Sequence, residues 1–214
     1  MNAPLAAGVT VALFSLLAVF GPVFGLSPAW IALLVGVGLG GLTLDAARFS
    51  GRGGHLLAEA LPGGQARLRR IAVHEAGHLL VAELESMPVK RVLVGSLACL
   101  QEGLAAGGIT ELDPPDHAKL PLEQLRRWSR VLLAGMAAEQ LIYGTCLGGA
   151  DDRALLGRLW GLSGHDVDTA QREQRRARRE MDQWLRRHRE QLEALAERMA
   201  GLAPRLGRPA KTEG

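Results

Sequence analysis

The first 44 residues of the 214-residue chain form an uncharged block that contrasts with the polar remainder. They contain no Asp, Glu, Lys, Arg or His, and two apolar stretches, 5–21 and 29–44, flank a short segment with two prolines and a glycine. Read as a helix that rises about 1.5 Å per residue, each stretch reaches roughly 25 Å, near the lower limit of a membrane span. The pattern predicts a transmembrane hairpin of two helices over residues 1–46, in contact with membrane lipid.

Arginines follow the second apolar stretch, whereas the stretch itself and everything before it lack Lys and Arg. They are Arg48, Arg52, Arg67, Arg69 and Arg70. Because basic segments stay on the cytoplasmic side of a bilayer, this asymmetry predicts an integral membrane protein with two spans. Both ends and the polar domain are then expected on the cytoplasmic (or stromal) side.

Beyond this hairpin, the spacing of apolar residues favours helices. The sequence predicts helices at 71–84, 122–143 and 153–160, and a long amphipathic helix at 166–202. Short β-branched segments at 89–95 and 107–111 are expected to pair as a small β-hairpin or sheet beside the first of these helices. The expected fold class is mainly α, with the transmembrane hairpin joined to a helical domain that includes this small sheet.

The same pattern divides the chain into four parts. After the hairpin at 1–46, a Gly- and Arg-rich linker is expected at 47–70. One helical domain, including the long C-terminal helix, is expected at 71–203. The Pro- and Gly-containing residues 204–214 are expected to form a disordered tail.

Composition gives little reason to expect a nucleic-acid partner. The formal net charge is only +3, and the Arg-rich run at 172–189 is interleaved with acidic residues at the spacing of ion pairs on a helix. Cys99 and Cys146 stand in no Cys/His spacing that is typical of a metal site, and a disulfide framework is not expected. We therefore expect no nucleic acid among the partners.

The segment His74-Glu75-Ala-Gly-His78 contains the pattern HExxH inside a predicted helix. Four residues advance a helix by about 400°, so His74 and His78 project from nearly the same face, as two imidazoles that bind one zinc ion must. Glu75 stands beside them, where a carboxylate can take a proton from water activated by the metal. The motif predicts a zinc-dependent peptidase in which Glu75 is the catalytic base.

A catalytic zinc site needs a third protein ligand and an open fourth position. A further histidine six residues after His78 is excluded, because that position is Leu84. Two downstream acidic candidates are Glu139, in an Ala-Ala-Glu-Gln-Leu segment, and the pair Asp151 and Asp152. From the residues alone, this choice stays open.

Three motifs in order resemble the peptidase domain of the FtsH family of membrane zinc proteases. They are His74-Glu-Ala-Gly-His78, Gly135-Met-Ala-Ala-Glu139-Gln-Leu-Ile-Tyr143-Gly144 and Gly149-Ala150-Asp151-Asp152. The resemblance implies that the third zinc ligand comes from the last motif. This motif is one residue shorter than the family's Gly-Ala-x-x-Asp, so either aspartate fits; Asp152 is favoured, and Asp151 is the alternate ligand or a cap of the following helix. Glu139 is expected to hydrogen-bond a ligand histidine or to brace the helix that carries the histidines, and the alternative is an ordinary buried or salt-bridged glutamate.

FtsH proteins carry an ATPase module before the peptidase, whereas no GxxxxGK[ST] phosphate-binding loop occurs in these 214 residues. The sequence thus resembles a short form that lacks the ATPase module. The resemblance implies Zn²⁺ as cofactor, a protein or peptide substrate, and either a homo-oligomer or association with an FtsH-type ATPase protease.

The function expected is that of a membrane-anchored, ATP-independent zinc metalloendopeptidase, which hydrolyses peptide bonds of membrane or loosely folded proteins. The first alternative is a catalytically silent, FtsH-like membrane adaptor or subunit. Retention of Glu75 argues against it, because a silent copy has no chemical need for that carboxylate. An intramembrane site-two-type protease is less favoured still, because Arg70 and Glu83 closely flank the HExxH segment.

Overall fold

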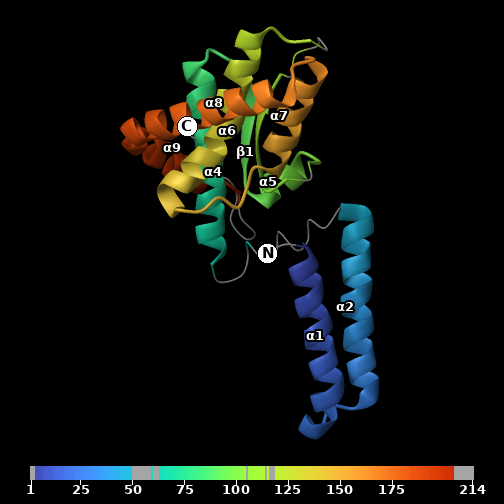
Figure 1. The fold of residues 1–214 in the computed structure, drawn as a ribbon. Helices are drawn as coiled ribbons and strands as arrows, with labels where there is room; N and C mark the ends of the chain where they lie inside the picture. Colours follow the sequence, from blue (N-terminus) through green and yellow to red (C-terminus); the bar gives the residue numbers. More distant parts are fainter. Residues whose placement is uncertain are drawn as a thin grey trace. The chain divides into compact units, whose positions relative to one another are not determined.

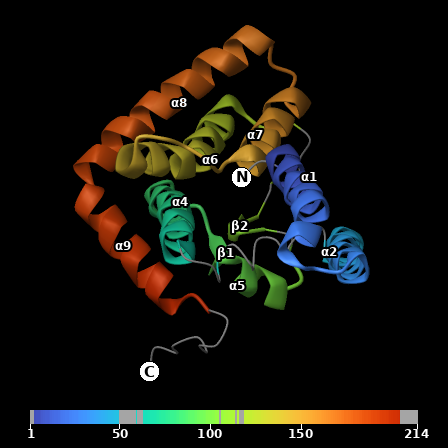
Figure 2. The same cartoon turned by 90° about the horizontal axis from the view of Figure 1, so that it is seen from below.

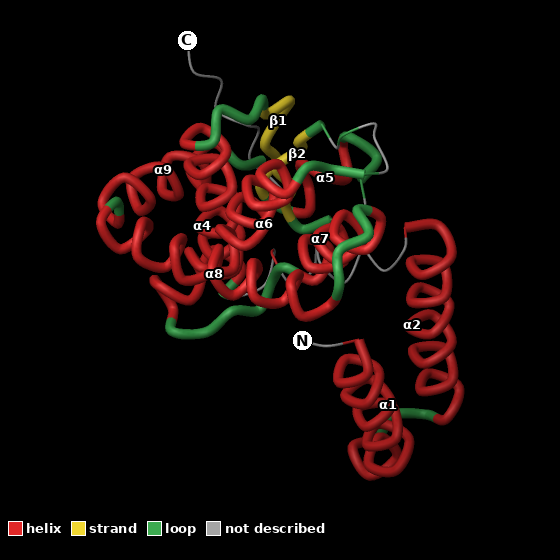
Figure 3. Tube along the Cα trace, turned by 45° about the horizontal axis from the view of Figure 1, so that its top comes forward, coloured by secondary structure: helices red, strands yellow, loops and turns green. Residues whose placement is uncertain are grey.

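The computed structural model of the chain describes residues 3–49, 59, 63–104, 106–113, 115 and 119–204. These residues are mainly helical, as the apolar spacing predicts, with one small sheet among the helices (Figures 1 and 3). The chain divides into two compact units, Met1–Gly54 and His55–Gly214, and each is described by itself.

The first unit is a pair of helices joined by a tight turn. Helix α1 covers Ala3–Phe20, a single 3-10 turn covers Gly21–Phe24, and helix α2 covers Pro28–Phe49. Gly25 ends the 3-10 turn with a φ of 79°, a left-handed conformation that glycine adopts without steric cost. The chain reverses here, so α1 and α2 pack against each other (Figure 1).

The prediction that these helices span a membrane is wrong. In the part of the chain that the structure describes, no helix combines the length and the apolar character that a membrane crossing requires. Helix α1 has 18 residues, about 27 Å at 1.5 Å per residue, which is at the short end for a hydrocarbon core about 30 Å thick. Helix α2 is longer, but its sequence includes four glycines, Asp45 and Arg48. The predicted localisation, an integral protein with two spans and a cytoplasmic or stromal domain, depended on these helices and is wrong as well.

The second unit carries the polar motifs. In chain order its elements are α4 (Gly64–Leu84), β1 (Val89–Val94), α5 (Ser96–Gln101), β2 (Gly108–Leu112), α6 (Leu122–Tyr143), α7 (Ala150–Leu162), α8 (Val167–Arg187) and α9 (Arg189–Leu202). Helix α4 packs against α6, α9 and both strands, and α6 also packs against α7 and α8 (Figure 2). The HExxH segment therefore lies in the interior of this unit.

Close packing of α4 on α6 depends on a glycine. A Cβ atom at Gly77 would lie 2.8 Å from the carbonyl oxygen of Ala134 and 2.8 Å from the Cβ of Ala138, so no larger residue fits between the two backbones. Around this contact, buried aliphatic residues of α4, α6, α8 and α9 form one core, which includes Leu68, Val73, Val81, Val131, Met181, Leu185 and Leu192. Burial of this apolar surface holds the HExxH helix in place.

A second core lies between α6, α7 and α8. It contains Leu125, Trp128, Leu132, Leu156 and Trp160. The Trp160 Nε1–H donates to the hydroxyl of the fully buried Ser129 over 3.0 Å, so the polar edge of this indole is satisfied inside the core. This core fixes α7, and with it the aspartates of the first helical turn, against α6.

The two predicted strands pair as expected. Strands β1 and β2 are antiparallel, with Val92 opposite Thr110 and Leu93 opposite Ile109. Because both strands pack on α4, the register places Thr110 next to the HExxH helix. The small sheet thus contributes to the site as well as to the fold.

Three of the predicted helices have different bounds in the structure. Helix α4 begins at Gly64, earlier than the predicted start at residue 71, and α7 begins at Ala150 and includes both aspartates. The predicted single helix at 166–202 is two helices that meet at His188, whose Nδ1 lies 2.8 Å from the carbonyl oxygen of Trp184. Residues 50–58 and 60–62 of the predicted linker at 47–70, and residues 205–214 of the predicted tail, lie outside the described residues.

Candidate metal centre

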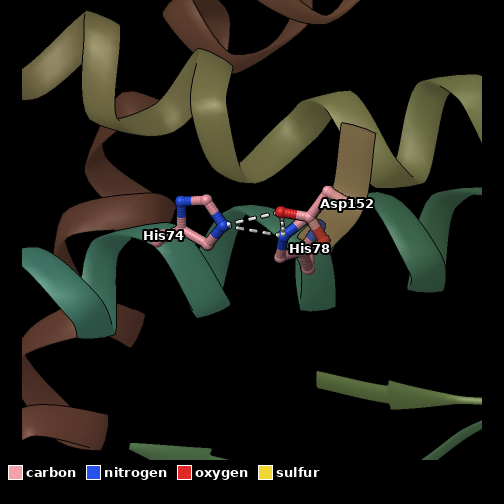
Figure 4. A group of neighbouring side chains, drawn as sticks. All are labelled: His74, His78 and Asp152. Carbon is pink, nitrogen blue, oxygen red and sulfur yellow. Dashed lines mark hydrogen bonds and ion pairs between the residues drawn. The ribbon is translucent and has the colours of Figure 1, made fainter. Parts of the chain in front are cut away.

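Three side chains from two helices converge on one point (Figure 4). His74 and His78 extend from successive turns of α4, and Asp152 extends from the first turn of α7. The Nε2 atoms of the two histidines are 3.1 Å apart, and the Oδ2 atom of Asp152 lies 3.1 Å from Nε2 of His74 and 3.4 Å from Nε2 of His78. Two nitrogens and one oxygen therefore form a nearly equilateral triangle.

This triangle matches the spacing of ligand atoms around zinc. Ligand atoms placed tetrahedrally at 2.0–2.1 Å from the ion are about 3.3 Å from one another. The observed separations of 3.1–3.4 Å agree with that value. Two imidazoles and one carboxylate are also a donor set of catalytic zinc sites, in which the fourth position stays open.

A glycine faces the triangle from α6. A Cβ atom at Gly135 would lie 2.5 Å from Nε2 of His78 and 2.6 Å from Nε2 of His74. Any side chain here would therefore press on both nitrogens that face the centre. Gly135 keeps α6 close to α4 while leaving both imidazoles in place.

The outer nitrogen of each imidazole is held by a hydrogen bond. Nδ1 of His74 lies 2.7 Å from Oε1 of Glu139, and Nδ1 of His78 lies 2.8 Å from the carbonyl oxygen of Val131. Both partners accept, so each Nδ1 carries the proton when the ring is neutral, and each Nε2 presents its lone pair to the centre. Both acceptors lie on α6.

Glu139 is the most deeply buried acidic residue of the site, with 2% of its surface exposed. Its Oε2 accepts from Nε of Arg70 at 2.6 Å and from the backbone N–H of Leu147 at 3.0 Å, and its Oε1 also accepts from the N–H of Gly148 at 3.1 Å. Burial alone would raise the pKa of Glu139, but the hydrogen bonds outweigh it and lower that pKa to about 2. Glu139 is therefore a permanent anion behind His74.

The surroundings of His74 favour positive charge. Burial acts to lower the pKa of His74, but hydrogen bonds with Asp152 and Glu139 outweigh it and raise that pKa to about 10. Burial would likewise raise the pKa of Asp152, whereas its contacts with His74 and His78 hold it below the usual range. Two carboxylates thus lie on either side of one imidazole, an arrangement that suits a divalent cation.

Glu75 lies beside the triangle with 5% of its surface exposed. Its Oε2 accepts a hydrogen bond of 2.8 Å from the hydroxyl of Thr110 on β2, which fixes the direction of the carboxylate. Burial raises the pKa of Glu75, although the two histidines act in the opposite direction. A carboxylate with a raised pKa accepts a proton more readily than an exposed one, as a general base must.

The structure brings together most of the residues singled out in the sequence. His74 contacts His78, Asp152 and Glu139, His78 also contacts Asp152, and Glu75 lies next to the histidines on the same helix. Asp151 is exposed on α7, and the residue at the N-cap of that helix is Gly149, so the cap interpretation of Asp151 is wrong. Because successive residues on a helix point about 100° apart, only one of two adjacent aspartates faces the histidines.

Two residues of the site were missed in the sequence. Thr110 gives no signal, because threonine is common in strands and its partner Glu75 is 35 residues away. Arg70 lies four residues before His74, the spacing that places two side chains on the same face of a helix, and this spacing was the signal available.

Comparison with known proteins supports a relationship to zinc metalloproteases. The chain is 38% identical over 90 residues to the ATP-dependent zinc metalloprotease FtsH of Methylococcus capsulatus, a match that covers 41% of this chain and 13% of that protein. It is 35% identical over 105 residues to the FtsH of Hahella chejuensis, covering 44% of this chain and 16% of that protein. The FtsH 2 of Symbiobacterium thermophilum is 39% identical over 87 residues, with 39% and 14% covered.

The chain therefore matches less than a fifth of the length of these relatives. No model of a known protein family matches it. The partial matches support a relationship to the FtsH metalloproteases over about two fifths of the chain.

Proposed function

We propose that the second unit is a zinc metalloendopeptidase that hydrolyses peptide bonds in loosely folded proteins. The observation that carries the proposal is the triangle of His74 Nε2, His78 Nε2 and Asp152 Oδ2, with sides of 3.1–3.4 Å, beside a buried carboxylate. The names of the partial relatives agree with this chemistry.

In this proposal His74, His78 and Asp152 hold the ion. Zinc, when bound, would polarise a water molecule and lower its pKa towards 7, close to the working pH. Glu139 and the carbonyl oxygen of Val131 keep both imidazoles in the tautomer that presents Nε2 to the ion. Their role is to orient the ligands rather than to react.

Glu75 carries the proton transfers. Its carboxylate, directed by Thr110, takes a proton from the attacking water and delivers it to the amine nitrogen of the departing peptide. Because the side chain is buried, the protonated form costs little, and the proton is held until the C–N bond breaks. General acid–base catalysis of this kind contributes roughly 10²–10⁴-fold to a rate.

The proposal assigns peptide hydrolysis without ATP to these residues. The substrates proposed are peptides and loosely folded proteins that need no unfolding, and these 214 residues contain no GxxxxGK[ST] loop. Assembly with further copies of this chain, or with an ATPase protease of the FtsH type, is proposed only as a means of supplying such unfolded substrates.

The test compares wild type with Glu75→Gln and with Glu83→Gln, a control that removes the same charge from an exposed position on α4. Zinc content after dialysis and cleavage of unfolded casein are measured for each, with and without ATP. We expect all three proteins to hold one zinc ion, and Glu75→Gln to cleave at least about 100-fold more slowly than the other two.

Equal cleavage by wild type and Glu75→Gln would refute the assignment of Glu75. Zinc-loaded wild type that cleaves nothing would favour the alternative of a catalytically silent adaptor. Failure of wild type to bind zinc would remove the proposal altogether.

A further inference from the structure

Arg70 touches several parts of the chain around the candidate metal centre. It lies on α4 one turn before His74, and 19% of its side chain is exposed. Its Nε donates to Oε2 of Glu139 at 2.6 Å, and its Nη2 donates to the carbonyl oxygen of Thr145 and to the Thr145 hydroxyl at 3.1 Å. Its guanidinium carbon also lies 4.9 Å from the centre of the Tyr143 ring. One planar cation therefore contacts α6 and the segment that follows it.

The contact with Glu139 matters because that carboxylate is buried and fully engaged. Oε1 faces His74 and the N–H of Gly148, and Oε2 faces Arg70 and the N–H of Leu147. Among these four donors, Arg70 is the one that is always charged. Without Arg70, the Glu139 carboxylate, whose side chain is 3% exposed, loses the one donor that is always charged, and its Oε2 retains only the N–H of Leu147.

The contact with Thr145 matters because of where the chain goes next. Residues 145–148 connect α6 to α7 between two glycines in left-handed conformations, Gly144 at φ 69° and Gly149 at φ 84°. Arg70 fastens this connection at Thr145, and Glu139 fastens it through the N–H groups of residues 147 and 148. Asp152 follows only three residues after Gly149, so this segment, together with the packing of α7 on α6, determines where the third ligand lies.

On the premise that the proposed zinc site is correct, we propose that Arg70 is a positioning residue for that site. Its guanidinium group holds, at the same time, the carboxylate that orients His74 and the segment that places Asp152. Two of the three ligands thus depend on one side chain that does not itself bind the ion.

The competing explanation is that Arg70 only balances the charge of Glu139. The two explanations differ in what they require of the side chain. An ammonium group on a flexible stem can balance the charge, but it lacks the planar fork that donates to Glu139 and Thr145 together. Arg70→Lys therefore separates them, since it keeps the charge and removes the fork.

The experiment uses the full chain with Arg70→Gln, Arg70→Lys and the control Arg69→Gln. Arg69 is the adjacent residue on α4, but 48% of its side chain is exposed, and it pairs at 2.5 Å with Glu197 of α9 rather than with Glu139. Zinc affinity is measured by competition with a chromophoric chelator, and ligand geometry is measured from the visible absorption of the Co²⁺-loaded protein. Thermal melting of each variant reports the structural effect separately.

We expect Arg70→Gln to bind zinc about 10–100-fold more weakly than Arg69→Gln, the range found when a partner that orients a ligand is removed. Its Co²⁺ spectrum should change, whereas that of Arg69→Gln should match wild type. Arg70→Lys should retain the melting temperature more fully than Arg70→Gln and still bind zinc at least about threefold more weakly than Arg69→Gln.

Equal zinc affinity and equal Co²⁺ spectra for Arg70→Gln and Arg69→Gln would overturn the proposal while leaving the zinc site itself intact. If Arg70→Gln does not fold, Arg70→Lys decides: zinc affinity equal to that of Arg69→Gln would overturn the role of the fork. Absence of zinc binding by wild type would overturn both this proposal and the proposed function.

Discussion

Replacing Gly135 with alanine is expected to abolish tight zinc binding while leaving the fold in place. The added Cβ would lie 2.5 Å from Nε2 of His78 and 2.6 Å from Nε2 of His74, whereas ordinary van der Waals contact begins at 3.4 Å. Both nitrogens, or α6 itself, must therefore move by about 0.8–0.9 Å. Bonding distances in metal sites tolerate deviations of about 0.2 Å, so a displacement of this size removes a ligand.

The matched control is Gly157→Ala, because a Cβ at this exposed position on α7 would meet nothing within 4 Å. Alanine in a helix interior is more favourable than glycine by about 0.5–1 kcal/mol, so the control should melt at a slightly higher temperature than wild type. Zinc affinity of the control should equal that of wild type within about twofold, and that of Gly135→Ala should be at least about 100-fold lower.

The assay is chelator competition for zinc, with circular dichroism to show that both variants are folded. Gly135→Ala protein that is folded and binds zinc as tightly as Gly157→Ala would refute the reasoning. It would mean that the two imidazoles do not need the space that this glycine leaves.

Three further predictions follow from the same contacts. Asp152→Asn should lower zinc affinity at least about tenfold, whereas Asp151→Asn, at the exposed neighbouring position, should leave it unchanged within about twofold; equal losses would contradict the assignment of the third ligand. Thr110→Val keeps the shape of the side chain but removes the hydrogen bond to Glu75, so the casein cleavage rate should fall about tenfold at unchanged zinc content; an unchanged rate would show that Glu75 needs no such support. Because the pKa of His74 without metal is about 10, both ring nitrogens carry a proton at neutral pH, and zinc must displace the one on Nε2. Zinc affinity should therefore rise about tenfold per pH unit between roughly pH 6.5 and 8.5. Competition titrations at several pH values measure this slope, and a pH-independent affinity would contradict it.

The helical periodicity of the sequence determined the core of the candidate site. Because α4 is helical, residues four apart share a face, and this alone brings His74 and His78 together. The limits of α6 and the pairing of the two strands also followed from local patterns of apolar and β-branched residues. These features depend on interactions between residues close in the chain, which a sequence displays directly.

The membrane prediction shows where such patterns mislead. Absence of charge over 44 residues favours two spans, but length and apolar content along each helix are separate requirements. Glycine, serine and threonine are uncharged, so they lengthen a segment without charge, but they add little apolar surface. In the region covered by the structure, no helix meets both requirements.

Only the tertiary structure decided which other groups join the two histidines. Asp152 lies 78 residues from His74, Glu139 lies 65 residues from it, and Thr110 lies 35 residues from Glu75. No local pattern relates residues at these separations, because their meeting depends on how α6, α7 and β2 pack on α4. The choice between Asp151 and Asp152 was of the same kind: a rotation of about 100° separates them on α7, and only the packing of that helix against α6 directs one of them to the metal-binding point.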